Sequence, residues 1–214
     1  MRYLVTAGPT REPIDPVRFL SNRSSGKMGY AIARAAIAAG HEVALITGPV
    51  ALRAPRGAEV VRVTTAREMF DAVHARIEGI DVAVLAAAVA DFTPAHVARA
   101  KIKKEDASLT LELKRTRDIL ASISRAPRTY LVAGFAAETD DLERNARAKV
   151  ARKKCDVICA NQVGNDAGFD RDDNALELFF ANGESLSLPH ESKRKLASRL
   201  IRILDQLKKN RKNV

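Results

Sequence analysis

The sequence contains no tryptophan, three tyrosines and seven phenylalanines among its 214 residues. Proteins that bind single-stranded nucleic acid stack the bases on aromatic side chains, so this composition argues against such a surface. No run of 18 apolar residues is present, which argues against a membrane-spanning helix. The chain also lacks an opening basic segment followed by an apolar stretch. We therefore expect no secretory signal and a cytoplasmic location.

Cysteine is also scarce, with Cys155 and Cys159 both in one short apolar segment. If that segment is a strand, the two side chains point to the same face. We expect both to be buried as small hydrophobic residues rather than to form a disulfide or a metal site.

Acidic residues are outnumbered, since 36 Lys and Arg face 26 Asp and Glu and give a formal net charge of +10. Much of the excess lies at 208–212 and 193–195. A solvated basic face is the simplest interpretation of this C-terminal cluster. Attraction of multiply anionic small substrates is the second, and DNA binding the third.

Five apolar runs, at 3–7, 42–47, 81–88, 130–135 and 156–160, have the length of buried strands. Helical patterns near 28–39, 66–78, 117–124 and 140–153 alternate with them. This alternation predicts an α/β fold with a mostly parallel sheet and helices on both faces.

Further strand patterns at 109–113 and 175–180, and a hairpin turn at Asn182–Gly183 into 185–188, predict a small antiparallel extension. A last amphipathic helix at 191–209 carries Leu196, Leu200, Ile203 and Leu207 on one stripe. No repeat or linker is visible, so we expect one domain over residues 1–214.

The segment between the first strand and the first helix is unusually long. About eighteen polar, proline-rich residues separate the strand from the helix, and loops of this length inside compact domains are usually functional. A strand, a Ser/Gly turn and a helix start together form an anion cradle, because unpaired N–H groups and the helix dipole face one spot. The pattern favours an enzyme that handles nucleotides or phosphates.

The two commonest nucleotide motifs do not fit this segment. A dinucleotide site requires an acidic residue after the second strand, where this chain has Thr47 and Gly48. A P-loop requires a glycine at the position of Ser21 and Ser or Thr at that of Met28. The phosphate site is therefore of another kind.

Three other segments carry candidate chemistry. An alanine run at 86–90 ends on Asp91, which could bind ribose hydroxyls or a metal; the alternative for the alanines is tight sheet packing. Lys101, Lys103 and Lys104 lie close together, and a lysine on a mobile loop could close over a polyphosphate, although such charge runs are usually solvated. Phe135, in the run at 134–139, precedes Lys149 and Lys153, which share a helix face, although a lone Phe135 is more often a core residue.

Taken together, the motifs resemble one family. They are Thr-Ala-Gly at 6–8, Thr-Arg-Glu-Pro-Ile-Asp-Pro-Val-Arg at 10–18, Ser-Asn-Arg-Ser-Ser-Gly-Lys-Met-Gly at 21–29, Ala-Ala-Val-Ala-Asp at 87–91, Lys-Ile-Lys-Lys at 101–104 and Gly-Phe-Ala-Ala-Glu-Thr at 134–139. Over essentially its full length the chain is similar to phosphopantothenoylcysteine synthetase, the phosphopantothenate–cysteine ligase of coenzyme A biosynthesis. The resemblance implies a three-layer Rossmann-like fold.

The resemblance also implies a two-step reaction. The carboxylate of 4′-phosphopantothenate attacks the α-phosphate of CTP (ATP in eukaryotic relatives) with Mg²⁺, and the amine of L-cysteine then displaces CMP from the acyl-cytidylate. It implies a homodimer with each site completed by the partner subunit. Many bacteria fuse this domain behind a decarboxylase. The chain starts at the first strand of the ligase, so it looks like a stand-alone form, to which a separate phosphopantothenoylcysteine decarboxylase could be a partner.

Residue roles follow from the same resemblance. Catalytic roles are implied for Asn22, Lys101 and Arg18, and no metal ligands can be assigned. The implied nucleotide-binding residues are Ala87, Asp91, Lys101, Arg117, Asp118, Ile119, Leu120, Phe135, Lys149 and Lys153. The implied residues for phosphopantothenate and the intermediate are Arg18, Asn22, Ser24, Ser25 and Gly26.

Two positions depart from the family pattern: Pro9 replaces a glycine and so removes an N–H, and Arg117 replaces a proline.

Two other functions stay open. An NAD(P)-binding Rossmann oxidoreductase predicts tight nicotinamide binding. A basic nucleic-acid-binding protein predicts salt-sensitive DNA binding that does not depend on Asn22.

Overall fold

The computed structural model describes residues 1–103, 108–163 and 171–212. Its centre is one eight-stranded sheet with the strand order β12-β11-β10-β9-β6-β1-β4-β5. Parallel pairing joins the six strands from β10 to β5, and β11 and β12 extend the sheet beyond β10 by antiparallel pairing. The bounds are β1 (Arg2–Ala7), β4 (Glu42–Thr47), β5 (Ala58–Arg62), β6 (Val82–Leu85), β9 (Leu131–Glu138), β10 (Val157–Gln162), β11 (Asp173–Phe180) and β12 (Ser185–Ser192).

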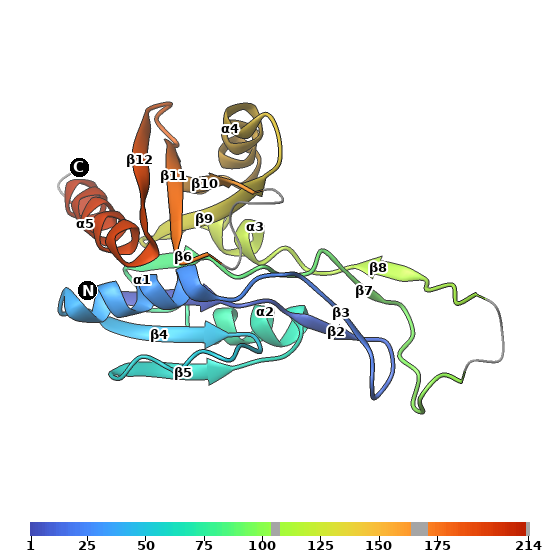
Figure 1. The fold of residues 1–214 in the computed structure, drawn as a ribbon. Coiled ribbons are helices and arrows are strands. Elements are labelled where there is room, and N and C mark those ends of the chain that lie inside the picture. The colour runs from blue at the N-terminus through green and yellow to red at the C-terminus, as the bar shows by residue number, and fades with distance from the viewer. Residues whose placement is uncertain (104–107, 164–170, 213–214) are drawn as a thin grey trace.

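Helices cover both faces of this sheet (Figure 1). Helices α1 (Lys27–Ala38) and α5 (Lys193–Lys212) bury apolar residues in one core cluster, together with Tyr3 and Leu45. Helices α2 (Ala66–His74), α3 (Ile119–Ser124) and α4 (Leu142–Lys153) contribute to a second cluster with Leu4 and Ile158. Successive strand residues therefore face opposite layers, as the pleat requires. The predicted three-layer, mostly parallel α/β fold with an antiparallel extension is confirmed.

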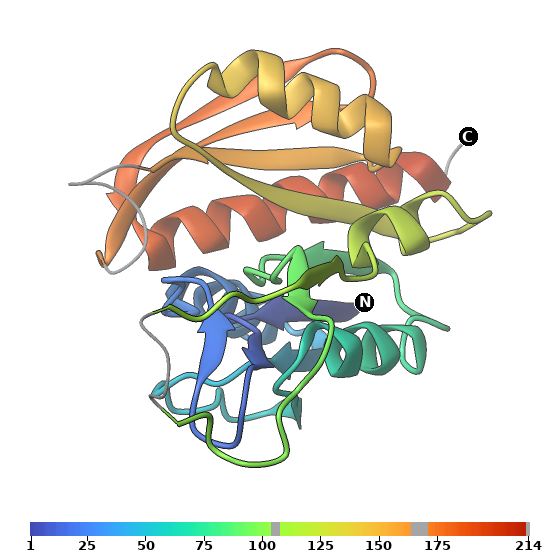
Figure 2. The same ribbon diagram turned by 90° about the vertical axis from the view of Figure 1, so that its right-hand side faces the viewer.

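Two hairpin arms leave the carboxyl edge of the sheet (Figures 1 and 2). The first arm is β2 (Arg11–Pro13) with β3 (Phe19–Ser21), inside the segment predicted as a long loop. The second arm is β7 (Phe92–Pro94) with β8 (Leu113–Arg115). The predicted strand at 109–113 is therefore wrong, because regular pairing begins only at Leu113. Leu109 and Leu113 remain 55% and 43% exposed, and no sheet face is available to bury their alternating pattern.

The two cysteines are free and buried, but they do not share a face. Cys159 lies in β10 and packs in the cluster of α1 and α5, whereas Cys155 precedes that strand and packs in the opposite cluster. Two residues that are four apart share a face only within one strand, and β10 begins at Val157, after Cys155. Burial raises the pKa of the Cys155 thiol to about 11.

The basic C-terminal cluster is not a simple solvated face. Lys208 is 5% exposed and its Nζ donates to the carbonyl of Thr129 at 2.7 Å. Arg211 Nη1 lies 3.0 Å from Asp156 Oδ1. These side chains attach α5 to the sheet layer, which sequence periodicity could not show.

No helix in the described ranges is long and apolar enough to cross a membrane.

Two glycines of the 21–29 motif set the turn into α1. Gly26 is the N-cap residue with φ 76°, in the left-handed region where glycine is favoured. Gly29 lies in the first turn of α1, directly against β1. An added Cβ would stand 2.6 Å from Ala7 Cβ and 3.0 Å from Thr6 O. Gly29 therefore permits close packing of helix on strand.

Replacing Gly29 by Ala tests this packing. Helix propensity alone would favour Ala by about 1 kcal/mol. The opposing contacts involve backbone atoms that cannot move aside, and overpacking costs typically about 1–3 kcal/mol. We expect Gly29→Ala to lower the free energy of unfolding in urea titrations, whereas a more stable variant would contradict the close approach.

Candidate functional site

Two neighbouring cavities open at the carboxyl edge of the parallel strands, between the bases of the two arms. This edge is where open α/β sheets bind their ligands. One cavity has a volume of about 610 Å³ and the other about 370 Å³. They share a wall formed by Ala87, Val89, Asp91, Phe135 and Lys149.

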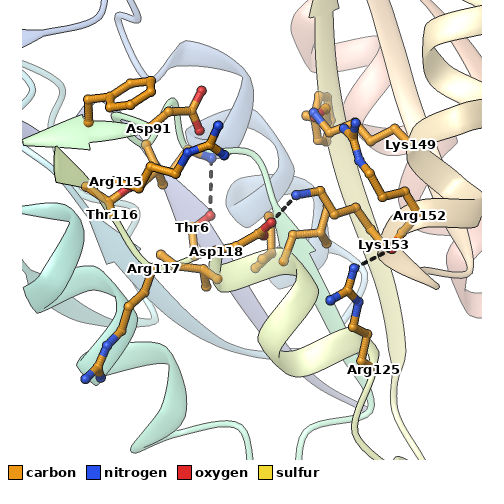
Figure 3. Close-up of a pocket in the computed structure, with 17 residues that line it drawn as sticks. Thr6, Asp91, Arg115, Thr116, Arg117, Asp118, Arg125, Lys149, Arg152 and Lys153 are labelled. Atoms are coloured by element: carbon orange, nitrogen blue, oxygen red, sulfur yellow. Dashed lines mark hydrogen bonds and ion pairs between the residues drawn. The ribbon is translucent and has the colours of Figure 1, made fainter.

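The larger cavity is rich in cationic side chains (Figure 3). Lys149, Arg152 and Lys153 reach it from α4, and Arg115 and Arg125 come from β8 and the end of α3. Of the residues assigned by resemblance to the nucleotide, the structure brings together nine on its lining: Ala87, Asp91, Arg117, Asp118, Ile119, Leu120, Phe135, Lys149 and Lys153.

Asp118 and Lys153 form an ion pair in this cavity. The other carboxylate oxygen of Asp118 accepts the N–H of Ala121 at 2.9 Å and so caps α3. Burial alone would raise the pKa of Asp118, but the Lys153 contact, the Ala121 N–H and the nearby Arg125 charge outweigh it. The net result is a lowered pKa, so Asp118 stays ionised and holds Lys153 at the cavity.

Lys149 is held differently, because its Nζ donates to the carbonyl of Phe135 at 2.8 Å. Burial lowers the pKa of Lys149, and Glu138 and Asp91 act in the opposite direction. A cation in this position contacts both cavities and can meet the anionic groups of a ligand in either one.

The smaller cavity is built on the 21–29 turn. Asn22, Ser24, Ser25 and Gly26, four of the five residues assigned by resemblance to phosphopantothenate and the intermediate, line it. Asn22 Nδ2 donates to the carbonyl of Ala88 at 2.9 Å, which fixes the amide at the cavity wall. The described part of the chain provides no side-chain cap for α1, so N–H groups of its first turn can bind an anion.

The two arms are attached to each other where they leave the sheet. The β1–β6 pairing continues as a bridge between Pro9 and Ala88. Ala88 N–H donates to Gly8 at 2.9 Å and Thr10 N–H donates to Ala88 at 3.3 Å. The hydrogen bonds of this ladder use no N–H at position 9. The proline that replaces the usual family glycine there therefore leaves the ladder intact.

Pro9 also occupies the space beside the end of β4. A Cβ on Gly48 would lie 1.8 Å from Pro9 O, so no larger side chain fits there. Dinucleotide-binding folds place an acidic ribose ligand after this strand. The packing at this position does not favour the oxidoreductase alternative.

Three assigned residues lie apart from the cavities or point away from them. Arg18 and Lys101 line neither cavity and belong to the arms. Arg117 Cζ lies 5.0 Å from the centroid of the Phe70 ring, and Figure 3 shows its guanidinium directed away from Asp118. Lys104, part of the predicted lysine cluster, lies outside the described residues.

Sequence reasoning missed several polar residues of both cavities. They are Arg115, Thr116, Arg125 and Arg152 in the larger one, and Asn174 and Lys193 in the smaller one. Lys27 of the 21–29 motif and Asn161, the polar residue that ends a predicted strand, also line the smaller cavity. The missed residues come from the second arm, helix ends and the antiparallel edge, which no local pattern connects to the site.

In the described ranges no three His, Cys, Asp or Glu side chains group together as a metal site. Mg²⁺ is commonly held by one or two carboxylates together with substrate phosphates. Asp91 fits that role, because its carboxylate lines both cavities and has no ion-pair partner in the described ranges.

The fold and the site define the chain as a Rossmann-like α/β domain with a cation-rich double cavity at its strand ends. Residues 1–207 match the family model described as "DNA/pantothenate metabolism flavoprotein C-terminal domain", and the chain belongs to this family.

Relatives agree with this membership. The chain is 47% identical over 208 residues to the coenzyme A biosynthesis bifunctional protein CoaBC of Bacillus subtilis, covering 96% of the chain and 51% of the relative. It is 49% identical over 212 residues to the CoaBC protein of Mycobacterium tuberculosis, covering 94% and 51%. The chain therefore spans about half the length of these relatives.

Solved structures agree as well. The crystal structure of a CoaBC C-terminal domain superposes with a TM-score of 0.83 at 38% identity, covering 100% of this chain and 96% of that one. The DNA/pantothenate metabolism flavoprotein of Streptococcus pneumoniae superposes with a TM-score of 0.81 at 24% identity, covering 97% and 99%, and supports the fold alone.

The Asp118–Lys153 pair predicts a pH dependence. A lowered folded-state pKa means that the ionised carboxylate stabilises the fold above the unfolded pKa, near 3.9, and that this contribution is lost as pH falls through the folded value. Asp118→Asn keeps the oxygen that caps α3 but removes the charge. We expect the variant to be less stable than wild type at pH 7 and the difference to shrink as the pH falls below about 3.9. Urea titrations between pH 7 and 3 measure this; a constant difference would contradict the assigned charge.

Proposed function

We propose that the chain is a phosphopantothenate–cysteine ligase domain that works through an acyl-cytidylate. The double cavity carries this proposal. A cation-rich chamber suited to a triphosphate adjoins a chamber lined by Asn22 and an uncapped helix start, and Lys149 and Asp91 lie in their common wall. Membership of the family and the names of its CoaBC relatives support the same assignment.

The chemistry follows from this arrangement. The nucleotide lies in the larger cavity and 4′-phosphopantothenate in the smaller one, so the substrate carboxylate meets the α-phosphorus at the shared wall. A carboxylate oxygen bonds to that phosphorus as the bond to pyrophosphate breaks. The cysteine amine then attacks the acyl carbon, the acyl–oxygen bond breaks, and CMP leaves while the amine proton passes to solvent.

The cations offset the repulsion between these substrates. Both are anions, and bringing them together is costly unless fixed positive charges lie alongside. Lys149, Lys153 and Arg152 serve the phosphates, and Asp91 would hold Mg²⁺, which would supply further positive charge there. Asn22, held by Ala88, orients the acyl-cytidylate.

We propose CTP rather than ATP as the nucleotide. The base would lie against Phe135 and the backbone near Ala87, where Ala86–Ala88 have no bulky side chains. Backbone N–H and C=O groups can match the edge of one base and leave another unpaired, which gives strong discrimination.

We further propose a homodimer in which the arms complete the partner's site. Arg18 and Lys101 lie on the arms and line neither cavity of their own chain. Exposed apolar side chains also gather on the arms: Val17, Phe19, Phe92, Val97 and Leu113 are 43–60% exposed. Such clusters commonly mark protein interfaces.

Product formation tests the ligase proposal. Pyrophosphate release is measured from CTP and separately from ATP, with 4′-phosphopantothenate and Mg²⁺, with and without cysteine. We expect release only with phosphopantothenate, preference for CTP, and CMP only after cysteine is added.

Lys101→Gln should keep the fold and slow turnover by about 100-fold, the typical effect of removing one transition-state donor.

Other outcomes would redirect the assignment. Absence of pyrophosphate with either nucleotide would sink the ligase proposal. Tight nicotinamide binding would favour the oxidoreductase, and salt-sensitive DNA binding unchanged in Asn22→Ala would favour the nucleic-acid-binding alternative.

Light scattering after gel filtration tests the dimer. Val97→Asp places a charge among the exposed apolar residues of the arms. We expect the wild type to have the mass of a dimer and this variant to have a mass closer to that of a monomer. Leu186→Asp is the matched control, since Leu186 is 43% exposed on β12 and not on an arm. Equal masses for both variants and wild type would argue against an interface at the arms.

A further inference from the structure

Asp15 is a buried carboxylate that none of the roles above uses. It lies at the tip of the first arm, and its side chain is fully shielded from solvent. Its two oxygens face different parts of the molecule. Oδ1 accepts the N–H groups of Val17 and Arg18, at 2.7 and 2.8 Å, and so closes the tip of the first arm.

The second oxygen joins this tip to the second arm. Asp15 Oδ2 accepts from Arg18 Nη1 at 2.6 Å and from the N–H of Ile102 at 3.2 Å. The same Arg18 nitrogen lies 3.3 Å from Ile102 O. Both backbone groups of Ile102 are therefore held, directly beside Lys101 in the sequence.

A further backbone contact supports this link, since Ala98 N–H donates to Ile14 O at 3.0 Å. Burial alone would raise the pKa of Asp15, but the three backbone N–H donors and the Arg18 charge outweigh it and lower the pKa. Asp15 thus remains a charged acceptor. Arg18 Nε and Nη2 donate to no described residue, which leaves that edge of the guanidinium for an anionic ligand.

We propose that Asp15 is a positioning residue of the ligase reaction, holding Arg18 and the Lys101 segment as one unit. The inference rests on the proposed function. Arg18 and Lys101 come from arms separated by more than eighty residues in sequence, and Asp15 contacts the first directly and the second through Ile102. A misplacement of about 1 Å in a catalytic group can cost about 100-fold in rate.

Asp15→Asn breaks this link selectively. Asn has one oxygen and one NH₂ group, and the oxygen is needed by two N–H donors at the tip. The NH₂ group then faces the Arg18 guanidinium and the Ile102 N–H, which are also donors. The tip of the first arm is kept, whereas the contact with the second arm is lost.

Glu12→Gln is the matched control. Glu12 is a buried carboxylate of the same arm, 2% exposed, but its Oε1 accepts the N–H of Ala66 at the start of α2 at 2.8 Å. The amide oxygen of Gln can accept the same bond. This variant removes a buried charge without touching Ile102.

Hydrogen exchange tests the link without reference to activity. In Asp15→Asn we expect amide exchange at 98–103 to be about tenfold faster or more, since protection follows local opening. Glu12→Gln should leave this segment unchanged. Ile102→Pro removes the Ile102 N–H that donates to Asp15, without altering the first arm. This variant replaces Asp15→Asn in the experiment if Asp15→Asn does not fold. Unchanged exchange in Asp15→Asn would overturn the link.

Kinetics tests the role. We expect kcat in Asp15→Asn and Ile102→Pro to fall by about 10- to 100-fold. The KM for CTP should stay close to wild type, since Asp15 lies outside the nucleotide cavity. Combined with Lys101→Gln, Asp15→Asn should slow the reaction by a smaller factor than it does alone, because the part of its effect that acts through Lys101 is already lost.

The outcomes separate the two proposals. A wild-type chain that forms no phosphopantothenoylcysteine overturns the proposed function and, with it, the role of Asp15. An active wild type with Asp15→Asn equally fast, or with fully multiplicative losses in the double variant, overturns the positioning role alone.

Discussion

The pairing of Gly8 and Thr10 with Ala88 is the contact on which the site depends. It carries the β1–β6 ladder past the core, so that two chain segments leave the sheet side by side. The Ala88 carbonyl accepts both Thr10 N–H and the Asn22 amide. Thr10 in turn accepts the N–H of Ala90 through its hydroxyl at 3.0 Å, one residue before Asp91. Asn22 and Asp91 therefore hold fixed positions on either side of one short ladder.

Two acids organise the surrounding cations. Asp118 holds Lys153 at the larger cavity while capping α3, and Asp15 holds Arg18 on the arms. In each case one carboxylate oxygen stabilises a backbone feature and the other binds a cation. A cation held in this way loses little conformational entropy when a ligand binds, because its side chain is already ordered. Only the N–H groups that the acid does not use change partner.

Local patterns were sufficient for the core strands and most helices. In β1 the residues from Tyr3 to Ala7 are all buried, and all but Thr6 are apolar, because both faces of the strand are covered. Helix α1 begins where Gly26 permits the turn. Patterns failed where burial depended on distant partners. The alternation at 109–113 lacks a sheet to pack on, and Cys155 falls outside the strand whose pleat would have placed it beside Cys159. Lys208 resembles a surface lysine in sequence but is buried against Thr129.

The sequence by itself determined the α/β architecture and the motif residues, since strand periodicity, helix starts and the 21–29 turn are local properties of the chain. Only the tertiary structure decided which of those residues meet. It gathered nine assigned positions in one cavity, directed Arg117 onto Phe70, and joined Asp15 to Ile102 across the arms. Such contacts depend on the sheet order and on how the arms fold back, and these are set by the whole core rather than by any single segment.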